Sequence, residues 1–157
     1  MLEDFSAGMD FEIWDSYSKD SSRPLFNRAL QGIYPPGSSF KLLTVIIALE
    51  NNLINPKKNF FCSGKYEFGD REFGCWMETG HGNLNLSSAI IQSCNVYFYE
   101  IAQMISIDLW SNYANRFNFG KFTNIDFPSE SKGLIANRNY MNKKYGRWGW
   151  AGGSLLH

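Results

Sequence analysis

The longest apolar stretch of the chain predicts a buried helix. Residues 35–37 are Pro-Pro-Gly, which stops any earlier regular structure, and apolar side chains then occupy most positions from 40 to 49. Asn51-Asn52 and Pro56 follow the run. The pattern therefore predicts a helix from Ser38 to Asn51 that is buried on most of its sides.

The rest of the chain reads as more helices with short strands between them. Residues 65–68 and 71–73 alternate around Gly69-Asp70, which predicts a β-hairpin. Three helices are predicted after the hairpin. The first is capped by Asn85 and ends at Ile91, the second covers residues 96–106, and the third covers residues 108–119 with Gly120 as its C-cap. The chain beyond Thr123 reads as loop-rich. These elements indicate an α+β fold in which helices dominate.

Composition limits the classes of protein that fit. The 157 residues suffice for one domain or part of one, and 17% are aromatic, which is typical of a folded protein. Lys and Arg balance Asp and Glu at 15 each, so no basic field for nucleic acid is expected. No apolar run approaches the roughly 20 residues of a membrane span, and residues 1–10 lack the pattern of a signal peptide.

Ser38 and Lys41 form a Ser-x-x-Lys pair at the predicted start of the buried helix. Residues three apart share a face of a helix, so the Lys41 amine can lie beside the Ser38 hydroxyl. The helix dipole and a desolvated pocket would both favour the neutral amine, which could activate the serine for acyl transfer. The alternative is a capped helix with a surface lysine. Ser-x-x-Lys also occurs at Ser16/Lys19 and at Ser129/Lys132, without this context.

Ser93-Cys94-Asn95, called the second motif below, is the only Ser-x-Asn in the chain. It lies between two predicted helices, where alternate residues of a turn can point the same way. Ser93 and Asn95 could then relay a proton and hold a substrate amide, while Cys94 points elsewhere. The alternative is that Ser93 and Asn95 only cap the helix that follows.

Three cysteines and one histidine suggest a metal site. The ligands would be Cys62, Cys75, His81 and Cys94, with 12, 5 and 12 residues between them. Three thiolates and an imidazole suit tetrahedral structural zinc, and such an ion would tie the hairpin to the second motif. Two alternatives stay open from the spacing alone, a Cys62–Cys75 disulfide and unrelated buried thiols.

Several segments resemble one family. They are residues 24–29 (Pro-Leu-Phe-Asn-Arg-Ala), 34–41 (Tyr-Pro-Pro-Gly-Ser-Ser-Phe-Lys), 80–82 (Gly-His-Gly), 93–99, 125–130 and 133–135. Together they resemble the penicillin-binding protein 2 family, the elongation-specific class B penicillin-binding proteins, which are peptidoglycan D,D-transpeptidases. The resemblance covers nearly the whole chain and implies part of a penicillin-binding, serine β-lactamase-like fold.

The resemblance also implies roles for the residues. Ser38 would be the nucleophile that attacks the penultimate D-alanine carbonyl of a stem peptide, Lys41 its general base, and Ser93 and Asn95 the second active-site motif. β-Lactams would acylate Ser38. Some family members hold zinc at positions that match the four ligands above. Expected partners are stem peptides, β-lactams and, for the full-length protein, a glycan-polymerising elongation partner. The expected role is cell-wall elongation at the periplasmic face of the inner membrane.

The chain departs from the family in ways that shape the expectation. The third motif, Lys-[Ser/Thr]-Gly, is absent, and so are the family's membrane anchor and pedestal. We therefore expect residues 1–157 to be the N-terminal part of a transpeptidase domain, truncated at both ends, and inactive and only marginally folded alone. Alternative functions are a non-catalytic penicillin-binding sensor, a degenerate fragment with a structural zinc knuckle, and a serine β-lactamase.

Overall fold

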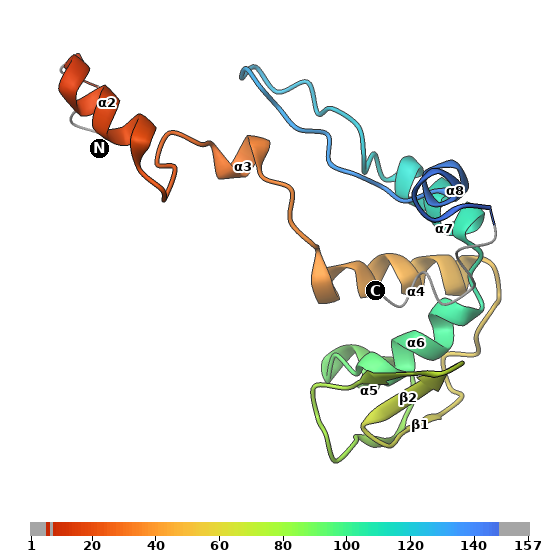
Figure 1. Cartoon of the computed structure of the whole chain (residues 1–157). Coiled ribbons are helices and arrows are strands. Elements are labelled where there is room, and N and C mark those ends of the chain that lie inside the picture. The colour runs from red at the N-terminus through yellow and green to blue at the C-terminus, as the bar shows by residue number, and fades with distance from the viewer. Residues whose placement is uncertain (1–5, 7, 148–157) are drawn as a thin grey trace. The chain divides into compact units, whose positions relative to one another are not determined.

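A computed structural model describes residue 6 and residues 8–147 of the chain (Figure 1). The described residues form two compact units. The first consists of residues up to Tyr34 together with 122–132, and the second of residues 35–121 together with those from Gly133 onward. None of the described helices is long and apolar enough to cross a membrane.

Two helices of the first unit lie within residues 8–34, and neither has a buried side chain. These helices are α2 (Phe11–Lys19) and α3 (Arg28–Gln31). Asn27 caps α3, because its side chain accepts hydrogen bonds from the amides of Ala29 and Leu30. Residues 122–132, the second segment of this unit, are bonded to α3, because the amide of Ser131 donates to the carbonyl of Leu30 at 2.8 Å.

The second unit contains the predicted buried helix, but in two pieces. A 3₁₀ turn η1 (Gly37–Phe40) leads into α4 (Lys41–Glu50), so Ser38 lies in the tighter turn and Lys41 begins the α-helix. Gly37 has a φ of 57°, a left-handed conformation that glycine adopts without steric cost. Leu43, Val45, Ile47 and Ala48 of α4 are buried.

Helix α6 (Asn95–Gln103) lies at the centre of the second unit. It packs against α4 on one side and the strands on another (Figure 1). The apolar core consists mainly of residues from α4, α6, α7 and the segments around the cysteines, and Ile47, Tyr97 and Ile101 are nearly inaccessible to solvent. Helix α5 (Leu86–Ile91) precedes α6 and is capped by Asn85, as the sequence predicts.

The strands form two antiparallel pairs. The predicted hairpin is confirmed as β2 (Lys65–Phe68) and β3 (Arg71–Gly74), which pair across Gly69-Asp70. Strands β1 (Phe60–Cys62) and β4 (Gly82–Leu84) pair separately. The α+β fold class is confirmed.

Two predictions about the C-terminal third were wrong. Helix α7 (Ile107–Arg116) ends before Gly120, because Asn118 takes up the left-handed conformation at φ 62°. Asparagine tolerates this conformation better than most residues, so no glycine is needed to end the helix. The segment read as loop-rich also contains a helix, α8 (Arg138–Tyr145), which Asn137 caps.

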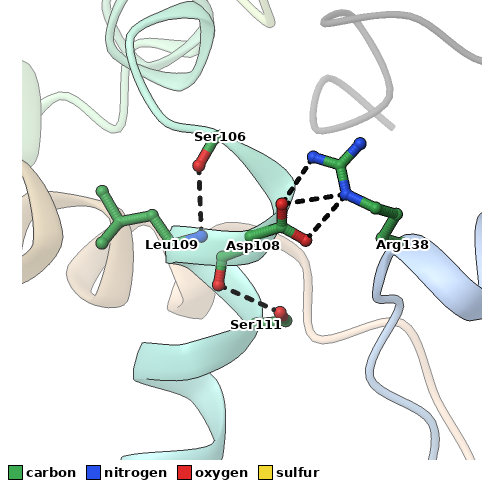
Figure 2. Close-up of polar contacts among 5 residues, drawn as sticks. All are labelled: Ser106, Asp108, Leu109, Ser111 and Arg138. Carbon is green, nitrogen blue, oxygen red and sulfur yellow. Dashed lines mark hydrogen bonds and ion pairs between the residues drawn. The ribbon is translucent and has the colours of Figure 1, made fainter.

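An ion pair joins α8 to the start of α7. Figure 2 shows the Arg138 guanidinium facing the Asp108 carboxylate, with Nε and Nη2 of Arg138 at 2.9 and 2.5 Å from Oδ2. The hydrogen bond from Arg138 lowers the pKa of Asp108. Arg138 and Asp108 are 30 residues apart in sequence. Helix α8 itself is mostly polar and buries only Met141, so the local apolar pattern did not predict it.

Candidate active site

Lys41 is the centre of the candidate site. Its side-chain nitrogen Nζ lies 2.7 Å from the Ser93 carbonyl oxygen, 3.0 Å from Ser93 Oγ and 2.7 Å from Asn95 Oδ1. The amine therefore donates to both polar side chains of the second motif. The structure brings together three of the four residues that the sequence predicted as catalytic.

Ser38 joins these residues at a common pocket. A cavity of about 210 Å³ is lined by Ser38, Ser39, Lys41, Leu42, Ile90, Ser93 and Phe98. The Phe98 ring closes one side of Lys41, with its centroid 5.3 Å from Nζ, a distance at which the ring face attracts a cation. Burial lowers the pKa of Lys41 from its ordinary value, while negative charge on Cys75 and Cys94 acts in the opposite direction.

The second motif has a backbone that separates its side chains, as the sequence predicted. Ser93 has a left-handed φ of 48°, and Cys94 then returns to an extended conformation as the N-cap of α6. Ser93 and Asn95 therefore face Lys41, while Cys94 is fully buried with the other cysteines. Cys94 makes no side-chain capping bond, and neither Ser93 nor Asn95 is the cap residue of α6, so the capping alternative is wrong.

The orientation of the Asn95 amide follows from its two partners. Its Nδ2 donates to the carbonyl oxygen of Gly74 at 3.3 Å, which leaves Oδ1 as the acceptor for Lys41. The role of Gly74 could not be predicted from the sequence, because every residue type has a backbone carbonyl. Sequence analysis also missed Phe98, which carries the same apolar pattern as its core neighbours.

The four predicted metal ligands converge behind the second motif. The ligand atoms of Cys62, Cys75, His81 and Cys94 all lie within 4.8 Å of one another, and the three thiols are free, so the Cys62–Cys75 disulfide is not formed. His81 Nδ1 is 3.5 Å from the Cys62 sulfur and 3.6 Å from the Cys75 sulfur. Zinc bonds of about 2.3 Å to sulfur and 2.0–2.1 Å to nitrogen imply tetrahedral edges of about 3.5 Å between such atoms.

The thiols have different electrostatic surroundings. Burial acts to raise the pKa of Cys75, but backbone amides of Met77, Asn95 and Val96 donate to its sulfur and lower the pKa overall. Burial, with the neighbouring thiols, raises the pKa of Cys94 to about 12. Three thiolates crowded together repel one another, and a divalent cation would offset this charge. The donor set and its spacing fit zinc.

This chain is similar to known proteins both in sequence and in fold. Residues 10–152 match the family described as the penicillin binding protein transpeptidase domain. The peptidoglycan D,D-transpeptidase MrdA of Acinetobacter baumannii is 35% identical over 147 residues, which are 92% of this chain and 22% of that protein. The chain thus spans about a quarter or less of the length of the curated relatives that it matches here.

Solved structures agree. Penicillin-binding protein PBP2 from Helicobacter pylori has a TM-score of 0.88 at 34% identity, over 99% of this chain and 29% of that one. The same protein in complex with MreC has a TM-score of 0.86 at 34% identity, over 95% of this chain and 28% of that one. Fold and sequence define a penicillin-binding transpeptidase domain, and the chain belongs to that family. Within it, the predicted resemblance to penicillin-binding protein 2 is confirmed.

Proposed function

We propose that this chain provides the nucleophile and the second motif of a peptidoglycan D,D-transpeptidase. The observation that carries this proposal is the hydrogen bonding of Lys41 to both Ser93 and Asn95 at a pocket that Ser38 also lines. A serine, an amine with a lowered pKa and a second hydroxyl in one pocket are the groups that acyl transfer through a serine requires.

In the first step, Ser38 Oγ attacks the penultimate D-alanine carbonyl of a stem peptide. Neutral Lys41 takes the hydroxyl proton as the C–O bond forms. The C–N bond to the terminal D-alanine then breaks, its nitrogen receives a proton, and the stem peptide stays on Ser38 as an ester. A β-lactam would enter the same step, but its leaving nitrogen would remain tethered to the acyl group.

In the second step, an amine from a neighbouring stem peptide attacks the ester carbonyl. The amine loses a proton to the site, the new amide cross-link forms, and Ser38 is released with its proton restored. Water in place of that amine would give hydrolysis instead. Exclusion of water from the pocket therefore decides between cross-linking and hydrolysis.

Ser93 is suited to move the proton between these groups. Lys41 Nζ has three acceptors at hydrogen-bond distance, and two of them are the backbone carbonyl of Ser93 and the amide oxygen of Asn95. Neither oxygen carries a proton that it could pass on. The Ser93 hydroxyl can accept from Lys41 and donate onward, so it is the relay to the leaving nitrogen. Asn95 would orient Lys41.

We also propose that Cys62, Cys75, His81 and Cys94 hold a structural zinc ion. When bound, zinc would supply charge compensation and a rigid link between the hairpin and the second motif, with no part in the reaction. The residues themselves prepare the site, because Cys94 is buried directly between Ser93 and Asn95, and amides at Met77, Asn95 and Val96 stabilise a thiolate at Cys75.

The proposed setting is cell-wall elongation at the periplasmic face of the inner membrane. It is supported by the similarity to MrdA proteins and to a PBP2 structure solved in complex with MreC. We propose that the protein from the complete gene acts on stem peptides, is acylated by β-lactams and works with a glycan-polymerising partner and the elongation machinery.

The test uses the protein produced from its complete gene and a stem peptide that ends in D-Ala-D-Ala. We expect release of D-alanine and formation of a cross-linked product by mass spectrometry. Ser38→Ala should abolish both, and Ser39→Ala, a neighbouring serine that also lines the pocket, is the matched control. The 157-residue chain alone should be inactive, because the third motif is not in its sequence.

Other outcomes would support the alternatives. A stable penicillin adduct without D-alanine release would indicate a penicillin-binding sensor. Rapid turnover of a chromogenic cephalosporin would indicate a β-lactamase. Zinc is tested separately by metal content after purification without chelator. About one equivalent is expected for four protein ligands, and a mass two hydrogens lighter than the reduced protein would establish the disulfide instead.

A further inference from the structure

Residues Gly74–Trp76 contact the second motif and its flanking residues at three successive points. The Gly74 carbonyl accepts from Asn95 Nδ2 at 3.3 Å, and the backbone amides of Asn95 and Val96 act on Cys75 by lowering the pKa of its thiol. The Trp76 indole Nε1 then donates to the carbonyl oxygen of Gln92 at 2.9 Å. The first two contacts are part of sites already described, namely the Asn95 amide of the candidate active site and the cluster of thiols. The third belongs to neither site described above.

Gln92 is the residue on which the strained turn at Ser93 begins. Helix α5 ends in a Schellman motif, in which the amide of Ser93 donates to the Ile90 carbonyl and the amide of Cys94 to the Ala89 carbonyl. Glycine usually occupies the left-handed position, but here it is Ser93 at φ 48°. This conformation is unfavourable for serine and persists only where surrounding contacts hold it.

Gln92 is the C-cap residue that directly follows α5, and its carbonyl has no partner inside the helix. The Trp76 indole supplies this partner from outside the helix, although Trp76 is not a buried core residue. Its side chain is 58% exposed, and its ring meets the edge of His81 at a centroid distance of 5.0 Å. The indole N–H therefore fixes the peptide unit that directly precedes Ser93.

We propose that Trp76 is a positioning residue for Ser93, acting through the Gln92 carbonyl and independently of the metal ligands. Loss of this bond frees the Gln92–Ser93 peptide to rotate, which shifts the Ser93 hydroxyl and carbonyl away from Lys41. The inference rests on the proposed function only for the expected change in the rate of Ser38 acylation. The effect on the turn follows from the contacts alone.

The test is Trp76→Phe in the protein from the complete gene, because phenylalanine keeps an aromatic ring beside His81 but has no N–H. Hydrogen exchange is followed by mass spectrometry in peptides that span residues 88–98. A neutral hydrogen bond corresponds to a change of about 3- to 10-fold. We expect the amides of Ser93 and Cys94 to exchange faster by that factor. Trp14→Phe, on the exposed face of α2, is the matched control and should change nothing in these peptides.

Two further readouts decide what the change means. Zinc content should equal that of the unsubstituted protein, and loss of zinc in Trp76→Phe would overturn the proposal, because Trp76 would then act through His81. The rate of Ser38 acylation by benzylpenicillin should fall about 3- to 10-fold in the acylation step, with binding of the drug unchanged. Unchanged exchange would also overturn the proposal. If the unsubstituted protein formed no adduct, the proposed function would fail while the exchange result still tested Trp76.

Discussion

Helices α5 and α7 of the second unit end in the same backbone motif, which α4 also forms at Asn52, but their left-handed residues have different surroundings. Helix α5 ends with Ser93 in the left-handed conformation and Cys94 after it, and α7 ends with Asn118 in that conformation and Phe119 after it. Neither position is a glycine. The Asn118 side chain accepts a hydrogen bond from exposed Lys121, whereas the Ser93 side chain accepts one from Lys41 at the pocket.

The comparison contrasts a left-handed serine that lines the pocket with a left-handed asparagine whose side chain bonds to an exposed lysine. Asparagine is among the residues that tolerate the left-handed conformation, so α7 ends at little cost. Serine tolerates it less well, and at Ser93 the turn is held by the thiol cluster below it and by Trp76 beside it. A hydroxyl at this position is what glycine could not provide. The variants below test whether this difference is functional.

The largest effect is expected where the α5 turn meets the thiol cluster. Cys94→Ala removes a proposed zinc ligand, so zinc content should fall well below one equivalent and the free energy of unfolding by about 3 kcal/mol or more. Metal analysis and urea denaturation measure both. Phe119→Ala changes the equivalent residue of the α7 turn. Because Phe119 is 38% exposed, this change should lower the free energy of unfolding by only about 1–2 kcal/mol and leave zinc bound. Full zinc occupancy in Cys94→Ala would contradict the assignment of that ligand.

The next effect concerns catalysis alone. Ser93→Gly keeps the backbone conformation and removes the hydroxyl, so acylation of Ser38 should slow about 10²-fold or more through loss of the proton relay. The free energy of unfolding should stay the same or rise, because glycine relieves the strain. Stopped-flow acylation kinetics and denaturation separate the two. An unchanged acylation rate would remove Ser93 from the mechanism.

A pH dependence should distinguish Lys41 from exposed lysines. Burial lowers the pKa of Lys41 in the folded protein, so between this lowered pKa and the ordinary value of about 10.4 the unfolded chain binds more protons. The free energy of unfolding should therefore rise with pH across that window, and Lys41→Met should flatten the rise. Urea denaturation at several pH values tests this, with Lys57→Met at an exposed position as control. Equal slopes in both variants would argue against a buried, neutral Lys41.

The smallest effect is expected at the α7 turn. Asn118→Gly relieves a mild left-handed strain and should raise the free energy of unfolding by up to about 1 kcal/mol. Acylation kinetics and zinc content should not change, since the Asn118 side chain bonds to Lys121 and its amide to the Asn115 carbonyl, away from both sites. A fall in the acylation rate would show that the two turns are not functionally distinct.

Much of this arrangement could be predicted from the chain, and the limits have physical causes. The helix after Ser38, the hairpin around Gly69-Asp70 and the cap at Asn85 depend on local signals and are confirmed. Helix α8 is polar and buries only Met141, so no apolar periodicity indicated it.

The candidate site divides in the same way. The Ser38/Lys41 pair and the four proposed metal ligands could be singled out as candidates from residue type and spacing. The partners of Lys41 lie more than 50 residues away, and only the fold shows that the amine reaches them. The roles of Gly74 and Trp76 depend on backbone carbonyls, which no residue pattern encodes.

The most direct test of the account is the position of the penicillin adduct. The protein from the complete gene is incubated with benzylpenicillin, digested and mapped by tandem mass spectrometry. The account predicts a single acyl group on Ser38, lost in Ser38→Ala, and none on Ser16 or Ser129, which also begin Ser-x-x-Lys sequences. An adduct on either of those serines, or no adduct while zinc is bound and the protein is folded, would contradict Ser38 as the nucleophile.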